Sequence, residues 1–209
     1  MAAPDATAAA VFTLQGNLFI SAQIERIFAQ KAREQSDKSY GLAKGENLKN
    51  KIATAYNICV AEWRDFKAQM ERTDLSAEER AASVERFAVR LFQNGLGYNE
   101  PSAVGSITLA DSTDPDTQLV YPVKYVIYQT SAQAKGMEKL PLVVVPPVTD
   151  NNERSDLDTK LTSCAVIDVE TQRAAGEKKR SPTGLLQRLL NVAADYKWGF
   201  AFNGYALAA

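Results

Sequence analysis

The spacing of apolar residues changes along the chain, from a helical period in the first half to strand-like runs in the second. Between residues 46 and 72, apolar positions recur three and four residues apart, which predicts a long amphipathic helix. We expect this stripe to pack in the core. The stripe consists of Leu48, Ile52, Ala55, Tyr56, Cys59, Trp63, Phe66 and Met70.

Two shorter helices are predicted on either side of this one. Asn17 is placed to cap a helix that contains Ile24 and Phe28. The stretch Ser76-Ala-Glu-Glu79 has the spacing of a capping box and opens a third helix. Asn94-Gly95 is typical of a helix end with a left-handed residue. The first half is therefore predicted to be helical.

The second half has the composition of β-structure. The run at 140–145 is continuously apolar, which is typical of a strand buried on both faces. Pro122 indicates an edge or a bulge within its segment. The polar stretch 149–160 is predicted to be a loop, and 164–169 is either a short strand or part of that loop. The main strand candidates are 106–110, 119–130 and 140–145.

A helix and a last strand follow. Ser181-Pro182 opens the helix with proline at its first position, and 198–202 is an apolar strand before the turn Asn203-Gly204. The predicted fold class is α+β, with about three helices in residues 1–97 and a mixed α/β sheet domain in 98–209. Because the return strand after Asn203-Gly204 is incomplete, we expect a fragment of a longer protein, truncated at this hairpin.

Composition excludes several kinds of chemistry. The chain has 24 basic and 25 acidic residues, a net charge of −1 and no histidine, so histidine-based catalysis and imidazole metal ligands are excluded. Cys59 and Cys164 fit neither a zinc site nor a disulfide framework. No glycine-rich phosphate loop is present. We therefore predict no catalytic, cofactor-binding or metal-binding residues in this chain.

Carboxylates are the remaining catalytic candidates. Nucleases with a PD-(D/E)xK core place an Asp at one strand end and an acid-x-Lys on the next strand, where they hold Mg²⁺. The apolar strand after residue 140 contains neither, and Gln172 stands where Asp168-Val-Glu170 would need a lysine. Solvated acids are the favoured interpretation. A divergent nuclease that uses Asp150, Asp168 or Glu170 is the alternative.

A basic run directly precedes the helix that starts at Ser181-Pro182. Phosphate groups favour such positions, because the free amides at a helix start add to the charge of the side chains. A solvated loop is an equally good interpretation of three clustered basic residues. The candidate nucleic-acid-binding residues are Arg173, Lys178, Lys179, Arg180 and Arg188.

Residues 180–207 resemble a known family. The segments 181–191 and 195–204 are similar to the N-terminal region of large bacterial adenine-N6 DNA methyltransferases. These belong to restriction-modification and phage-defence systems, including the DISARM methylase and type II-G enzymes. The same layout resembles the end of the nuclease-like fold of type I restriction subunits, which implies a degenerate PD-(D/E)xK-like core. The motif residues are Ser181, Pro182, Asn191, Trp198, Gly199, Asn203 and Gly204.

The resemblance implies a non-catalytic N-terminal module of a DNA methyltransferase that supports DNA binding or docking to the methylase body or other defence subunits. The S-adenosylmethionine site would lie in the remainder of the parent protein. A small interaction or accessory subunit without a nucleic-acid role is a further alternative. Within the motif we expect Asn191 and Asn203 to be structural and Trp198 to lie in the core.

The first residues and the hydropathy of the chain indicate where in the cell the protein is located. Residues 1–10 contain no Lys or Arg and no apolar run follows them, so a secretory signal is not predicted. No segment of 18 apolar residues is present. We therefore expect a cytoplasmic protein that does not bind membranes.

Overall fold

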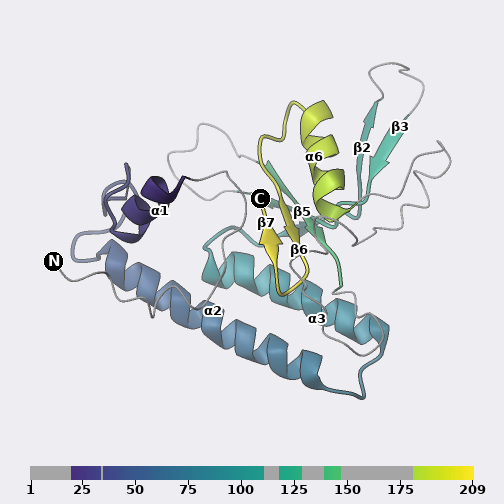
Figure 1. Cartoon of the computed structure of the whole chain (residues 1–209), viewed down its shortest axis with the longest axis horizontal. Coiled ribbons are helices and arrows are strands. Elements are labelled where there is room, and N and C mark those ends of the chain that lie inside the picture. The colour runs from purple at the N-terminus through teal and green to yellow at the C-terminus, as the bar shows by residue number, and fades with distance from the viewer. Residues whose placement is uncertain (1–19, 34, 111–117, 129–138, 147–180) are drawn as a thin grey trace. The chain divides into compact units, whose positions relative to one another are not determined.

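The computed structural model describes residues 20–33, 35–110, 118–128, 139–146 and 181–209, and its fold class is α+β, as predicted (Figure 1). The helices are α1 (Ser21–Phe28), α2 (Leu48–Glu71), α3 (Ala77–Arg90), a π-helical turn η2 (Leu91–Gly95) and α6 (Pro182–Val192). The strands are β1 (Ser102–Ala103), β2 (Ile107–Ala110), β3 (Gln118–Tyr121), β4 (Tyr125–Tyr128), β5 (Lys139–Val144), β6 (Phe200–Phe202) and β7 (Leu207–Ala208).

The chain divides into two compact units, Met1–Asn50 and Lys51–Ala209. In the first, α1 starts after Ile20, whose amide donates to the side chain of Gln23. The predicted cap Asn17 lies outside the described residues. The start of α2 is capped by Asp37, whose Oδ1 accepts a hydrogen bond of 2.7 Å from the Leu48 amide.

The second unit contains the rest of α2, α3, α6 and all the strands. The predicted capping box at the start of α3 is confirmed. Ser76 Oγ accepts from the Glu79 amide at 3.2 Å, and the Ser76 amide donates to Glu79 Oε2 at 2.8 Å. One turn later, the guanidinium of Arg80 donates to the carbonyls of Met70 and Arg72. Arg80 thereby satisfies carbonyls at the end of α2 and fixes the tight helical hairpin.

The predicted α2 stripe is buried at its first residue, Leu48, and again towards its C-terminal end, but not between them. Phe66 and Met70 are buried, and the ring of Phe66 stacks on Phe87 with a centroid distance of 4.6 Å. By contrast, Ile52 is 48% exposed and Tyr56 is 52% exposed, so the prediction that they are core residues is wrong. The physical reason is length, because α2 has 24 residues and its partner α3 only 14.

The end of α3 also differs from the prediction. The helix continues through the π-helical turn η2, and the left-handed glycine is Gly97, with φ of 74°, rather than Gly95. Gly95 is buried against α2, where an added Cβ would lie 2.4 Å from Cys59 Sγ. Close packing on α2, rather than a positive φ, therefore explains the glycine at position 95.

The main sheet has the strand order β1-β4-β5-β6-β7, while β2 and β3 form a separate antiparallel pair. All neighbours in the main sheet are antiparallel except β5 and β6, which are parallel. The predicted strand 119–130 is therefore two strands in different sheets. Pro122 lies at the break, where it has no amide hydrogen to donate to a ladder.

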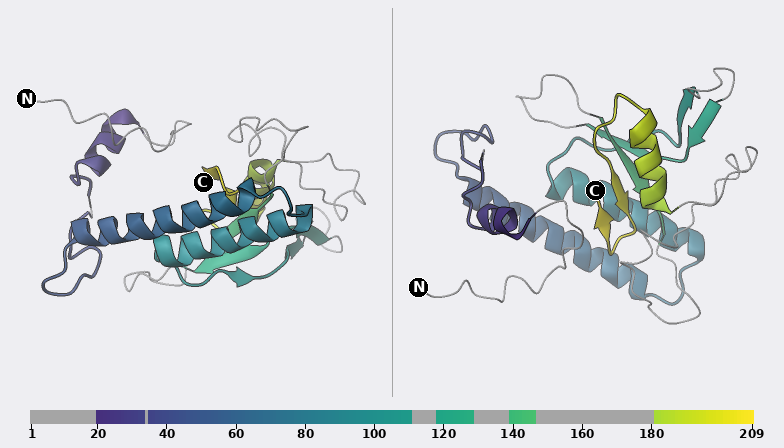
Figure 2. Two further views of the ribbon diagram at one scale, coloured as in Figure 1. Left: turned by 90° about the horizontal axis from the view of Figure 1, so that it is seen from below. Right: turned by 45° about the horizontal axis from the view of Figure 1, so that its top comes forward.

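Helices cover both faces of the main sheet (Figures 1 and 2). Because strand side chains alternate in direction, Val126, Val143 and Ala201 pack with α6 on one face. Ile127, Leu142 and Phe202 pack with α2 and α3 on the other. The result is a three-layer unit whose sheet lies between α6 and the α2–α3 hairpin.

The central strand β5 is buried on both faces, as its apolar run predicted. Pro141 is accommodated within it because the ladder with β6 starts one residue later, at Leu142 and Phe200. Beside Pro141 lies Gly199, where an added Cβ would be 2.9 Å from the Pro141 carbonyl oxygen. Within the described ranges, none of the helices combines the length and the apolar character needed to cross a bilayer.

Candidate functional site

The helix predicted at Ser181-Pro182 is present as α6 and is built for packing on one side. Ser181 is its N-cap, with Oγ accepting from the Gly184 amide at 3.1 Å, and Pro182 occupies the first turn. Leu185 and Leu189 are fully buried against the sheet. The N-cap and the leucine stripe together fix which face of α6 turns outward.

The outward face of α6 carries a polar stripe. Gly184, Gln187, Arg188 and Asn191 follow the spacing i, i+3, i+4 and i+7, which places them on one side of a helix. Gln187 and Asn191 are exposed, and Arg188 is partly buried. The helix contains no Asp or Glu. Arg188 is a candidate that the sequence predicted, whereas Gln187 is one that it did not. The polar positions could have been identified from the sequence as those that the leucines of the helix do not occupy.

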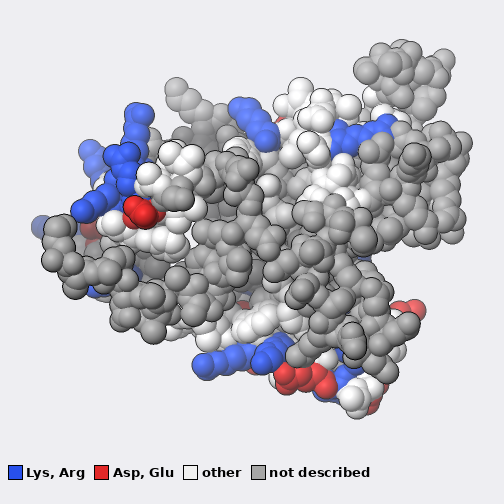
Figure 3. Space-filling view, in the orientation of Figure 1, with Lys and Arg blue, Asp and Glu red and all other residues white. Residues whose placement is uncertain are grey.

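The predicted nucleic-acid-binding residues lie mostly outside the described part of the chain. This applies to Arg173, Lys178, Lys179 and Arg180, whereas Arg188 lies on α6. Between residues 181 and 209 the other basic residue is Lys197, after the end of α6. Basic side chains lie on either side of the α6 region in Figure 3. The segment 173–199 contains six basic and two acidic residues, a net charge of +4 in a chain of net charge −1.

One prediction about the connection from α6 to β6 is wrong. Trp198 is 49% exposed rather than a core residue. The next residue, Gly199, is buried, and an added Cβ there would lie 2.5 Å from Leu186 on α6. Because neighbouring residues in an extended chain point in opposite directions, the tight packing of Gly199 turns Trp198 toward solvent.

Asn203 and Gly204 have structural roles in the turn between β6 and β7. Asn203 is 1% exposed, and its Oδ1 accepts hydrogen bonds from the amides of Tyr205 (3.0 Å) and Ala206 (2.7 Å). Gly204 has φ of 90°, and an added Cβ would lie 2.4 Å from Cζ of Phe66. This part of the motif therefore holds the hairpin against α2.

A charged cluster joins the start of β4 to α3. Just before β4, Lys124 forms an ion pair with Glu85 of α3, and the hydroxyl of Tyr125 donates to the same carboxylate at 3.2 Å. Burial raises the pKa of Tyr125, and the charge of Glu85 raises it further. This cluster joins α3 to the sheet through one carboxylate, which is already engaged by a lysine and a phenol.

The nuclease alternative would use Asp150, Asp168 or Glu170, and all three are outside the described residues. Within the described part, no three His, Cys, Asp or Glu side chains come together in a group that could hold a metal ion. The part of the sheet that the structure describes therefore supplies no assembled metal centre with which to develop the nuclease alternative.

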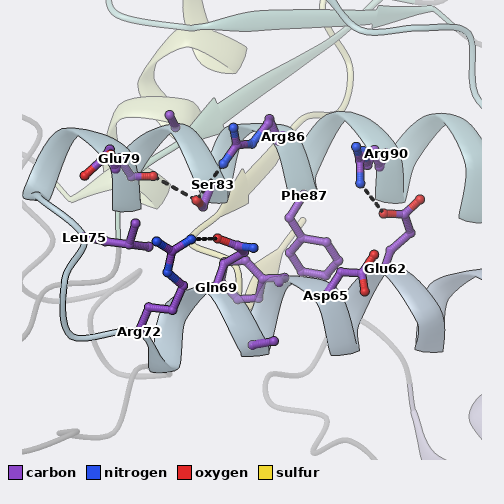
Figure 4. Close-up of a pocket in the computed structure, with 13 residues that line it drawn as sticks. Glu62, Asp65, Gln69, Arg72, Leu75, Glu79, Ser83, Arg86, Phe87 and Arg90 are labelled. Atoms are coloured by element: carbon purple, nitrogen blue, oxygen red, sulfur yellow. Dashed lines mark hydrogen bonds and ion pairs between the residues drawn. The ribbon is translucent and has the colours of Figure 1, made fainter.

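A groove of about 700 Å³ lies between α2 and α3 (Figure 4). It is lined by charged side chains of both signs over a floor that includes Phe66 and Phe87. An ion pair between Arg90 of α3 and Glu62 of α2 spans the groove, with Nη1 of Arg90 3.4 Å from Oε2 of Glu62. The charged residues of its lining are Glu62, Asp65, Arg72, Glu79, Arg86 and Arg90.

Most of these charges are engaged with their neighbours. Arg86 Nη2 donates to Ser83 Oγ at 2.9 Å, and Arg72 Nη1 donates to Gln69 Oε1 at 3.4 Å. Arg72 also donates two hydrogen bonds to Asp74, which hold the pKa of that carboxyl below its usual range. The groove therefore works mainly as a polar seam between two helices, and its balanced charge does not indicate an ionic ligand.

Comparison with known proteins adds no relative, since no protein-family model, no curated protein and no solved structure matches this chain. Among the surfaces that the structure describes, the outer face of α6 presents exposed amide side chains beside Arg188.

Proposed function

We propose that this chain is a non-catalytic, DNA-contacting module of a bacterial adenine-N6 DNA methyltransferase from a restriction or antiphage defence system. The observation that carries the proposal is the uneven charge. Residues 173–199 hold a net charge of +4, so the rest of the chain holds −5. A basic segment of this kind attracts DNA phosphates, whereas the acidic remainder of the chain repels them.

The layout of the sheet supports the nuclease-like part of the proposal. An antiparallel series β1-β4-β5, then a helix and a parallel strand β6, is what a degenerate PD-(D/E)xK-like core would require. The apolar strand β5 contains no acid, which a nuclease of this kind would need. A chain without that acid would keep a DNA-facing scaffold without holding the metal.

In this proposal, the methyl-transfer chemistry and the S-adenosylmethionine site belong to the remainder of the parent protein. The chain contributes a docking surface for the methylase body or other defence subunits. The resemblance of residues 180–207 to the N-terminal region of such methyltransferases supports this assignment. This assignment to a methyltransferase would be tested by reading the open reading frame past residue 209.

DNA binding tests the proposal directly. Fluorescence anisotropy with a labelled duplex should give weak, salt-sensitive binding by the full chain. Changing Lys178, Lys179 and Arg180 together to Ala should reduce the affinity and lower the slope of log K against log salt by about 0.9 for each phosphate that the variant no longer neutralises. The matched control changes Lys49, Arg64 and Lys67 of α2 to Ala, which removes the same number of positive charges from a different part of the chain.

Three outcomes would contradict the proposal. If the chain does not bind duplex DNA at low salt, the accessory-subunit alternative is favoured. If the α2 control loses as much affinity as the triple variant, the basic segment is not the contact surface. If the wild-type chain nicks plasmid DNA with Mg²⁺ and changing Asp150, Asp168 or Glu170 to Asn or Gln abolishes nicking, the chain is a nuclease.

A further inference from the structure

We draw no further inference here: the strongest candidate, the exposed apolar stripe of Ile52 and Tyr56 on the N-terminal half of α2, carries nothing because no residue that the structure describes shows what covers it.

Discussion

At the scale of single residues, several glycines are present because a neighbour occupies the space of a side chain. Gly95 lies against Cys59, and Gly199 lies against Leu186 and Pro141. The backbone φ angle is positive at neither. These glycines join layers of the unit, since one connects η2 to α2 and the other connects the start of β6 to α6 and β5.

Gly95→Ala should therefore destabilise the protein by about 1–3 kcal/mol, because its Cβ would overlap Cys59 Sγ. Most of this loss should disappear when Cys59 is also changed to Ala, since the next nearest atom, Leu91 Cδ1, is at an ordinary contact distance of 3.5 Å. Urea denaturation of the two single variants and the double variant measures the coupling. If Gly95→Ala lowers the free energy of unfolding equally in the wild type and in the Cys59→Ala variant, the contact with Cys59 is not the cause.

At the scale of elements, the hairpin of α2 and α3 is held by interactions at its helix ends. The capping box satisfies amides at the start of α3, and Arg80 satisfies carbonyls at the end of α2. The hydrogen bond from the Ser76 amide favours the charged form of Glu79 and lowers its pKa. The stability of this hairpin should therefore depend on pH.

The sign of that dependence follows from the lowered pKa. The contribution of Glu79 is present above its unfolded-state pKa, about 4.3, and is lost as the pH falls through the lower pKa of the folded state. In melting temperatures recorded from pH 7 to pH 3, Glu79→Gln should flatten the acid limb relative to the wild type. Glu78→Gln is the matched control, because it removes a charge from the same turn and leaves the capping box intact. A steep acid limb in Glu79→Gln would contradict the assignment.

At the scale of the whole molecule, stability should be greatest in the middle of the sheet of the unit Lys51–Ala209. Strand β5 has neighbours on both sides and helices on both faces, whereas β1 and β7 are two-residue strands at the edges. Opening an edge strand breaks few contacts, but exposing β5 requires that the layers separate.

Native-state hydrogen exchange should therefore show the slowest amides in β4 and β5, exchanging with the free energy of global unfolding. The amides of β1 and β7 should exchange at least about tenfold faster through local opening. Exchange measured by NMR at two denaturant concentrations distinguishes local from global opening, because only the latter depends strongly on denaturant. Equal protection of edge and centre would contradict the layered description.

Particular residues show how far the sequence could predict this fold. The capping box at Ser76 and Glu79, the proline start of α6 and the buried run of β5 were predictable because each depends on neighbours close in the chain. The exposure of Trp198 and of Tyr56 was not, because it depends on whether a distant element covers that surface. For the candidate site, the sequence indicated the basic residues, but the accessible face of α6 could be selected only after its leucines were placed on the sheet.

The sequence by itself determined the fold class, most of the elements and the exclusion of histidine chemistry, since local spacing and residue types are sufficient for these. The tertiary structure alone decided the pairing of β1, β4 and β5, the parallel addition of β6 and the split of 119–130 into two sheets. It also brought Lys124 to Glu85, 39 residues apart in the chain. These features come from long-range packing, in which a contact between distant segments forms only when the layers around it are in place.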